Sequence, residues 1–398
     1  MSLSSDIKHN RFHDYEVSVP SGTVAARVRQ TRHEYSFGTA AFALVGDPDS
    51  AELAEYEERL QRFMNFATLP FYWGRYEPVE GQPMEKETLA AAKWAREHGF
   101  TTKGHPLCWH TVCADWLLQC DNDMILQKQL DRIRRDVSLY RGVIDMWDVI
   151  NEVVIMPVFD KYDNAVSRIA NHIGAVELTL KCFEAARESN PEATLLINDF
   201  NLSPDYEHLI EELLDRGCPI GAIGLQTHQH QGYHGVEKTM DVIDRFARFG
   251  KPLHFTEITI LSGHPVPPHI TDLNDYQLEE WPSTPEGEER QREMVEEYYS
   301  AIFSRPETHA MIWWSPTDGG WLGAPAGLLR KDLSPKPAFE RLEVLIRGEW
   351  WFSEQEVRAG ADGKLHFAGV AGEYEIRIGE TAHRVALGPE NRNGIVHA

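Results

Sequence analysis

The fold is decided by two short runs of sequence, Asp145-Met-Trp-Asp-Val-Ile-Asn-Glu152 and Pro252-Leu-His-Phe-Thr-Glu-Ile-Thr-Ile260. Each run is rich in β-branched and apolar residues and carries a carboxylate at or near its end. A strand that does not alternate between polar and apolar residues is buried on both faces, as in a parallel sheet covered by helices. In a parallel barrel, the chemistry lies where strands end and the next loops begin. The two runs therefore predict a parallel barrel with Glu152 and Glu257 on its active face.

Strand-like runs and helical patterns alternate along most of the chain. Several of the helical patterns end near a glycine, as helix C-termini tend to do. Eight alternations fit an α/β fold of the (β/α)8 TIM barrel type better than an open doubly wound sheet. No Gly-x-Gly-x-x-Gly follows the first strand, which also disfavours a dinucleotide-binding fold. The predicted strands are Ser36–Ala40, Phe63–Trp73, Thr102–Trp109, Ile144–Glu152, Thr194–Phe200, Ala222–His228, Leu253–Ile260 and Ala310–Pro316. The predicted helices are Lys86–His98, Met124–Tyr140, Ala175–Ser189, Tyr206–Arg216, Val236–Phe249, Glu288–Phe303 and Pro337–Arg347.

The two ends of the chain have a different sequence pattern from the predicted barrel. The N-terminal end reads as β structure, with two alternating runs around Pro20-Ser-Gly22 that indicate a hairpin. The C-terminal end has short alternating runs separated by turn signals such as Asp362-Gly363. We divide the chain into an N-terminal β segment (1–36), a barrel (37–347) and a small C-terminal β module (348–398). The two β segments are candidates to pair with each other.

Composition limits the possible partners. The 398 residues carry a formal net charge of −23, whereas nucleic-acid binding needs a basic face. No hydrophobic run reaches transmembrane length. We therefore expect neither nucleic acid nor a membrane as a partner. The polar N-terminus, Met1-Ser-Leu-Ser-Ser-Asp-Ile-Lys-His9, is not a signal peptide, so the location stays open between the cytoplasm and export after removal of a leader.

The five cysteines form neither a disulfide framework nor a metal motif. Their number is odd, and a chain of this length does not need cross-links, so we expect them to be reduced. Three of them lie near His105 and His110, but their spacing lacks the Cys-x-x-Cys of zinc sites. We expect no metal and no cofactor.

Glu152 and Glu257 are the strongest candidates for chemistry. Glycoside hydrolysis needs two carboxyl groups, one acid/base and one nucleophile or second base. Spacing alone does not establish this, because many strands end in a glutamate that caps a helix or meets a lysine. Other strand ends, however, also carry polar or aromatic residues that point to the same face. These motifs are Gly104-His-Pro-Leu-Cys-Trp-His110, Trp147-Asp-Val-Ile-Asn-Glu152, Ile197-Asn-Asp-Phe-Asn201, Gly224-Leu-Gln-Thr-His228, Thr256-Glu257 and Trp313-Trp-Ser-Pro-Thr-Asp318.

Together these motifs resemble glycoside hydrolase family 10, the retaining endo-β-1,4-xylanases. The resemblance runs from about Phe37 to Arg347, and the Trp-Asp-Val-Ile-Asn-Glu run is its strongest motif. It implies cleavage of β-1,4-xylosidic bonds in xylan or xylo-oligosaccharides, with retention and without a cofactor. The partner it implies is a carbohydrate substrate.

By this resemblance Glu152 matches the acid/base and Glu257 the nucleophile. That assignment implies carboxyl groups about 5–5.5 Å apart, the retaining separation. Asn151 matches a residue that binds the sugar 2-hydroxyl, and His228 matches one that orients Glu257. Further matches line the subsite of the cleaved sugar (His105, Trp109, Gln226), form an aromatic floor beneath it (Trp314) and provide a second platform (Trp321). Read without the family, Trp109 and Trp314 are also compatible with core aromatics, and His105 and His228 with structural histidines.

Two positions depart from the family pattern. The second strand of the family usually ends in a Glu-Asn pair with a Lys three residues later; here Tyr72 stands where that Lys is expected. Arg75 or Glu77 are candidate replacements nearby. Because an aromatic side chain replaces one that binds hydroxyl groups, the sequence leaves open which sugar binds on the non-reducing side. After the nucleophile, the family's Glu-x-Asp becomes Glu257-Ile-Thr259, so an uncharged side chain backs His228.

Three functions stay open at this point. The first is a retaining xylanase. The second is the same chemistry on another β-glycoside, motivated by Tyr72 and by a long loop, 261–287, that carries Tyr276 and Trp281. The third is a sugar-binding barrel without catalysis, against which the two intact glutamates count.

Overall fold

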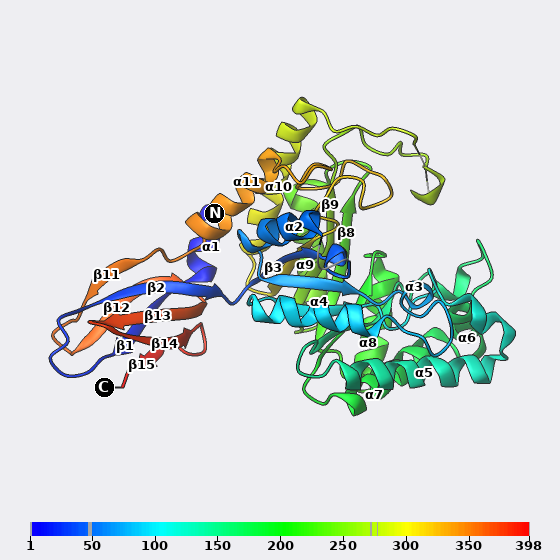
Figure 1. Ribbon diagram of the computed structural model, residues 1–398, viewed down its shortest axis with the longest axis horizontal. Helices are drawn as coiled ribbons and strands as arrows, with labels where there is room; N and C mark the ends of the chain where they lie inside the picture. Colours follow the sequence, from blue (N-terminus) through cyan, green and yellow to red (C-terminus); the bar gives the residue numbers. More distant parts are fainter. Residues whose placement is uncertain (1, 47–49, 271–272, 277, 398) are drawn as a thin grey trace.

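The computed structural model describes residues 2–46, 50–270, 273–276 and 278–397. It contains a barrel of parallel strands surrounded by helices and an elongated β unit beside it (Figure 1). The C-terminus lies at the β unit, and helix α1 (Leu3–Arg11) lies where this unit meets the barrel.

The barrel is closed and follows the strand order β10-β3-β4-β5-β6-β7-β8-β9, with parallel pairing throughout. The TIM-barrel prediction is therefore confirmed. The strands are β3 (Ser36–Ala40), β4 (Phe66–Pro70), β5 (Thr101–His105), β6 (Met146–Asn151), β7 (Thr194–Asp199), β8 (Ala222–Gln229), β9 (Leu253–Ile260) and β10 (Thr308–Trp313). The predicted strands ending at Trp73 and Trp109 are too long. Beyond the ends of β4 and β5, Phe71 and Leu107 are buried and each still donates one backbone hydrogen bond to the next strand, to the carbonyls of His105 and Asp148, but regular strand pairing has ended.

The helices surround the barrel and connect successive strands. They are α2 (Ala51–Gln61), α3 (Trp73–Tyr76), α4 (Glu85–Glu97), α5 (Asn122–Leu139), α6 (Ala165–Ile173), α7 (Ala175–Ser189), α8 (Pro204–Asp215), α9 (Gly235–Ala247), α10 (Pro285–Phe303) and α11 (Pro337–Val344). All seven predicted helices are present, with ends shifted by a few residues. Helix α2 was not predicted, because it is rich in charge and buries only Tyr56 and Leu60. Helix α6 was not predicted either; the Asn164 side chain caps it by accepting from the Ser167 amide at 2.7 Å.

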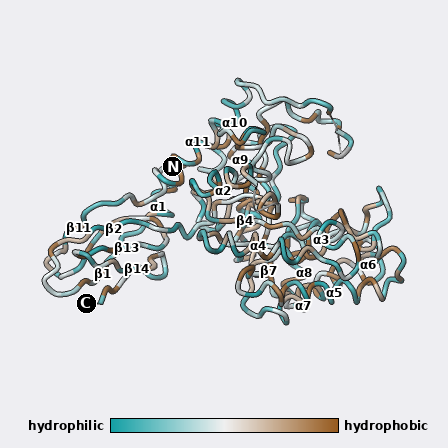
Figure 2. Tube along the Cα trace, viewed as in Figure 1, coloured by the Kyte–Doolittle hydropathy of each residue, from teal (hydrophilic) through white to brown (hydrophobic). Residues whose placement is uncertain are grey.

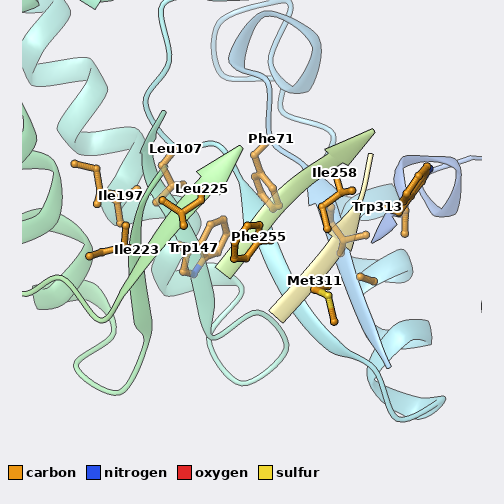
Figure 3. Packing of buried hydrophobic residues seen from close by; sticks show 14 of the residues in the cluster. Phe71, Leu107, Trp147, Ile197, Ile223, Leu225, Phe255, Ile258, Met311 and Trp313 are labelled. Carbon is orange, nitrogen blue, oxygen red and sulfur yellow. The ribbon is translucent and has the colours of Figure 1, made fainter. Parts of the chain in front are cut away.

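Large apolar side chains from successive strands pack between the barrel and the helices around it (Figure 3). Trp147 of β6 is fully buried, and its ring lies against Gly104 of β5. A Cβ atom at Gly104 would lie 2.2 Å from Cζ3 of the indole, so only glycine allows this close approach. Every residue of β9 is buried, which explains why the sequence of this strand does not alternate.

The β unit is built from both ends of the chain. One sheet has the order β12-β1-β15 and the other β11-β2-β13-β14. The strands are β1 (Phe12–Ser18), β2 (Ala25–His33), β11 (Gln355–Arg358), β12 (Lys364–Val370), β13 (Gly372–Ile378), β14 (Thr381–Leu387) and β15 (Asn393–Ile395). The N-terminal strands thus pair with the C-terminal ones, as the sequence allowed.

The predicted N-terminal hairpin is wrong, because β1 and β2 lie in different sheets. Tyr15 and Val17 of β1 and Val28 of β2 belong to one buried cluster to which both sheets contribute. Burial of these apolar faces against each other favours two packed sheets over a two-stranded hairpin. The residues before β1 are also not β structure, since they form α1.

Arg11 joins the β unit to the barrel. Its Nε donates to the Phe303 carbonyl at 2.7 Å, and its Nη2 donates to the Thr308 carbonyl at 2.9 Å. Phe303 ends α10 and Thr308 begins β10. The β unit is therefore attached at the end of the barrel opposite to the carboxyl ends of the strands.

Trp350 and Trp351 also lie at this junction. Trp350 is 3% exposed and stacks on Phe303 with ring centroids 4.3 Å apart. The guanidinium of Arg347 lies 4.5 Å from the ring centre of Trp351. These tryptophans serve packing and do not form an exposed aromatic surface of the β unit.

The outer helices carry hydrophilic and hydrophobic residues interleaved along their length (Figure 2). In α5, for example, Ile125, Ile133 and Val137 are buried, as expected for a helix with one face on a barrel. Across the part of the chain that the structure describes, no helix has both the length and the apolar character needed to cross a membrane.

We expect Arg11→Ala to destabilise the protein by about 1.5–3 kcal/mol, because carbonyl groups at the end of α10 lose a charged donor. Arg27→Ala is the matched control, since Arg27 pairs with Glu354 at 3.4 Å and its side chain is 71% exposed. That pair should contribute less than about 1 kcal/mol. Urea unfolding measures both variants, and equal destabilisation would contradict the role assigned to Arg11.

Candidate active site

Glu152 and Glu257 lie at the carboxyl ends of their strands. Glu257 belongs to β9 and is 5% exposed. Glu152 directly follows β6 and is half-buried, with a backbone φ of 58°, in the left-handed region. Its amide donates to the Asn198 carbonyl of β7 at 2.8 Å.

Both oxygens of the Glu257 carboxyl have partners. Asn198 Nδ2 donates to Oε1 at 3.0 Å, and His228 Nε2 lies 3.1 Å from Oε2. His105 Nε2 is 4.0 Å from Oε1. The Nδ1 atom of His228 lies 3.0 Å from the Thr259 hydroxyl. With its proton on Nε2, His228 donates to Glu257 and accepts from Thr259, which fixes the direction of the carboxyl group.

The environment of Glu152 favours the protonated acid. Trp109 Nε1 donates to Oε2 at 2.7 Å, and Gln226 Nε2 donates to Oε1 at 3.3 Å. Burial, followed by the nearby charge of Glu257, raises the pKa of Glu152 to about 8. A carboxyl group that keeps its proton near neutral pH can act as a general acid.

His105 is held by a buried charge pair. Its Nδ1 lies 2.7 Å from Asp148 Oδ2, and Lys103 Nζ lies 2.6 Å from the same oxygen. Burial opposes ionisation of Asp148, but Lys103 and His105 together keep the pKa of this carboxyl below its usual range. The anion fixes the ring orientation of His105, whose other nitrogen faces Glu257.

Asn151 has an unsatisfied donor at the centre of the site. Its Oδ1 accepts from Asn198 Nδ2 at 2.8 Å and from Gln226 Nε2 at 3.0 Å. Its Nδ2 is buried and has no partner among the described residues. An unpaired buried donor is costly in the absence of a ligand, so this amide is suited to bind an oxygen that enters the site.

Asn198 is a site residue that the sequence prediction left out. It bridges Asn151 and Glu257, and its Oδ1 accepts from the Thr256 hydroxyl at 2.5 Å. A Cβ atom at Gly224 on the neighbouring strand would lie 2.4 Å from Asn198 Oδ1. The glycine of the Gly-Leu-Gln-Thr-His motif therefore makes room for this side chain; the sequence motif that contains Asn198 marked the end of the strand but not this contact.

Aromatic side chains form a wall on one side of the carboxyl pair. The Tyr72 ring lies 5.3 Å from Trp109 and 5.6 Å from both His105 and Phe42, between centroids. Trp314 is buried and meets His105 edge-on at 5.0 Å and Phe42 at 5.3 Å. Burial, and then the charge of Glu257, holds the pKa of Tyr72 well above its usual value, so the phenol stays neutral. Phe42, in a short 3₁₀ turn after β3, had no recognisable signal in the sequence.

The remaining predicted residues take different positions. Trp321 stacks on His228 with centroids 4.9 Å apart and rings 8° from parallel. Arg75 is exposed on α3, with its guanidinium 5.9 Å from the centre of the Tyr72 ring. Glu77 is not available as a sugar ligand, because it is buried and bound to Trp73 Nε1, the Gly81 amide and Arg135.

The long loop after β9 has its own small core. Trp281 is 9% exposed and donates through Nε1 to the His264 carbonyl at 3.1 Å. The Tyr276 hydroxyl lies 2.9 Å from His264 Nε2. Residues 271–272 and 277 of this loop lie outside the described residues. The two aromatic residues that suggested a further sugar contact are thus engaged in packing within the loop.

Within residues 2–46, 50–270, 273–276 and 278–397, no three His, Cys, Asp or Glu residues come together in a way that could hold a metal ion. The five cysteines are free thiols. A protonated carboxyl beside a second carboxyl that is held by hydrogen bonds, on the active face of a TIM barrel, is the type of site found in glycoside hydrolases.

The family follows from comparison with known proteins. The model of Glycosyl hydrolase family 10 matches residues 37–344, and the chain belongs to this family. The resemblance read from the strand-end motifs is thereby confirmed.

Relatives and solved structures agree with this membership. Endo-1,4-beta-xylanase C of Paenibacillus barcinonensis is 25% identical over 366 residues, which cover 81% of this chain and 32% of that protein. The chain thus spans about a third of that relative's length. The endo-1,4-beta-xylanase of Geobacillus stearothermophilus is 28% identical over 62% of this chain and 77% of its own. A GH10 structure from Paenibacillus barcinonensis superposes with a TM-score of 0.64 at 25% identity, over 78% of this chain and 94% of that one.

We expect the Glu152 carboxyl to titrate near pH 8 and its midpoint to fall in Glu257→Gln, because that change removes a neighbouring negative charge. The midpoint should stay above 4.5, since burial is the larger cause. ¹³C NMR of labelled glutamate carboxyls measures both values. Glu211→Gln, on the exposed face of α8, is the control and should leave the midpoint unchanged; an equal midpoint in Glu257→Gln would show that the two carboxyls do not interact.

Proposed function

We propose that this barrel is a retaining glycoside hydrolase that cleaves β-1,4-xylosidic bonds in xylan or xylo-oligosaccharides by double displacement. The observation that carries the proposal is the unequal state of the two carboxyls. Glu152 keeps a proton near neutral pH, while Glu257 has a hydrogen-bond partner at each oxygen. One group is suited to give a proton and the other to attack.

In the first step, a Glu257 oxygen attacks the anomeric carbon of the sugar. The bond from that carbon to the leaving oxygen breaks, and the proton of Glu152 goes to the leaving oxygen. The product is a covalent glycosyl-enzyme on Glu257. Hydrogen bonds from Asn198 and His228 orient the Glu257 carboxylate before the attack.

In the second step, Glu152 acts as a base. Formation of the covalent bond removes the charge of Glu257, and this charge is one of the causes of the raised pKa of Glu152. The pKa therefore falls in the intermediate, and the Glu152 carboxylate can take a proton from water. The water oxygen attacks the anomeric carbon, Glu257 leaves, and the configuration is retained.

The surrounding side chains bind the sugar. The unpaired Nδ2 of Asn151 would donate to the sugar 2-hydroxyl, a contact that strengthens in the transition state. Gln226, His105 and Trp109 would line the subsite of the cleaved sugar, with Trp314 beneath it. Trp321 would be a second platform, through the indole face opposite to His228. Family membership and the names of the relatives support xylan as the substrate.

A second candidate is the same chemistry on another β-glycoside. It is favoured by Tyr72, which packs against Phe42 and Trp109 where the family pattern has a hydroxyl-binding lysine. The guanidinium of Arg75 lies 5.9 Å from the centre of the Tyr72 ring, at the edge of that wall. A neutral aromatic wall would accept a less polar or differently decorated group on the non-reducing side.

Proton NMR of a xylohexaose digest, followed from the first minutes, tests the proposal. We expect the β-anomer of the product to appear first, because double displacement retains configuration. Early α-anomer would keep the substrate and overturn the mechanism. No cleavage of xylohexaose, with turnover of another β-glycoside, would favour the second candidate.

Glu152→Ala should slow substrates according to their leaving group. Aryl xylosides with acidic leaving groups need little protonation and should retain most of their glycosylation rate, whereas xylan should lose about 10²–10⁴-fold. Glu257→Ala is the matched variant and should lose nearly all turnover on both substrates. Equal losses in Glu152→Ala on acidic and basic leaving groups would argue against its role as the acid.

A further inference from the structure

The backbone of Glu152 is strained. Its φ of 58° lies in the left-handed region, which residues other than glycine rarely adopt. Such a conformation costs free energy and persists only where the surroundings hold it. It turns the chain sharply after β6, so the side chain of Glu152 meets Trp109 Nε1 and Gln226 Nε2.

Asp199, at the end of the neighbouring strand β7, holds the residues that follow Glu152. Its side chain is fully buried. Oδ2 accepts from the Val154 amide at 3.1 Å and Oδ1 from the Asn201 amide at 2.9 Å. The amides of Val153 and Phe200 also bond this carboxyl. The carboxylate thus binds backbone N–H groups from both strand ends.

The position of these bonds is specific. The amide of Glu152 is bound by the Asn198 carbonyl, and the next two amides are bound by the Asp199 carboxyl. Three successive N–H groups are therefore fixed by two adjacent residues of β7. Together these bonds determine the turn on which Glu152 stands.

We propose that Asp199 is a positioning residue that fixes the left-handed backbone at Glu152 and thereby aims its carboxyl at the leaving oxygen. This inference rests on the acid/base role of Glu152 in the proposed function. Asp199 touches neither Glu152 Oε1 nor Oε2 in the described hydrogen bonds, so it acts through the backbone and through its charge.

The charge of Asp199 has a second effect. Its proximity is one of the causes, after burial and Glu257, that raise the pKa of Glu152. Burial raises the pKa of Asp199 itself to about 7, against the amide bonds that stabilise the anion. Above that pH the Asp199 anion helps Glu152 to keep its proton, and the two groups titrate together.

The test is Asp199→Asn, which removes the charge and keeps one acceptor oxygen. Asp205→Asn, on the exposed first turn of α8, is the matched control. We expect the kcat/KM of Asp199→Asn to fall about 10–100-fold on aryl xylosides with poor leaving groups and little on those with good ones, because the acid is misdirected. The alkaline limb of the pH profile should move to lower pH, because Glu152 loses a neighbouring negative charge.

Equal losses on both kinds of leaving group, with an unmoved alkaline limb, would overturn the proposal and leave Asp199 a purely structural residue. If Asp199→Asn does not fold, a measurement on the unmodified protein tests the proposal instead. In ¹⁵N-valine-labelled protein, the amide signals of Val153 and Val154 should shift with a midpoint near pH 7, as Asp199 titrates. If these amide signals do not respond between pH 5 and 9, the proposed hold of Asp199 on the backbone after Glu152 is wrong.

Failure of the proposed function is a separate result. If the unmodified protein cleaves no xyloside, the xylanase proposal fails, but the pH response of the Val153 and Val154 amides still tests the positioning role. A shared midpoint near pH 7 supports it, and amide signals that do not respond contradict it.

Discussion

Closure of the barrel is the constraint on which the rest of the structure depends. β3 and β10, from opposite ends of the barrel sequence, pair in parallel from Ser36 and Ala310 onwards, and the Thr39 hydroxyl donates to the Trp313 carbonyl at 2.8 Å. With no free edge, every strand is covered by helices outside and by side chains inside, so both faces of the strands are buried. Closure also brings the carboxyl ends of all eight strands to one face. Glu152, directly after β6, and Glu257, within β9, are far apart in the chain and come together for that reason.

Two neighbouring carboxyls repel each other when both are ionised, and here the two groups have different surroundings. Glu257 receives hydrogen bonds at both oxygens, while burial keeps the proton on Glu152. The arrangement has a consequence for stability. The folded pKa of Glu152, about 8, lies above its ordinary value of 4.5. The favourable contribution of its proton is therefore fully present below about pH 4.5 and is lost as the pH rises through about 8. The raised pKa of Glu152 thus makes the folded state less tolerant of alkaline conditions.

The β unit and the active site lie at opposite ends of the barrel. The β unit is fastened through Arg11 to the end of α10 and the start of β10, and through the stacking of Trp350 on Phe303. In TIM barrels the face with the amino ends of the strands contributes stability, whereas the other face carries chemistry. The terminal segments can therefore brace the barrel without restricting the loops around Glu152 and Glu257.

The sequence by itself determined the barrel, its eight strands and the residues at their ends, because burial on both faces leaves a continuous apolar run that ends in polar residues. It also identified the two glutamates and the departures at Tyr72 and Thr259. Only the tertiary structure decided which neighbours these residues meet. Asn198, Phe42 and Asp199 gained their roles from register and loop packing between strands that are separate in sequence. The prediction of an N-terminal hairpin was wrong for the same reason. β1 and β2 each have an apolar face, and the local sequence pattern does not say whether two such strands lie side by side in one sheet or face each other from two sheets.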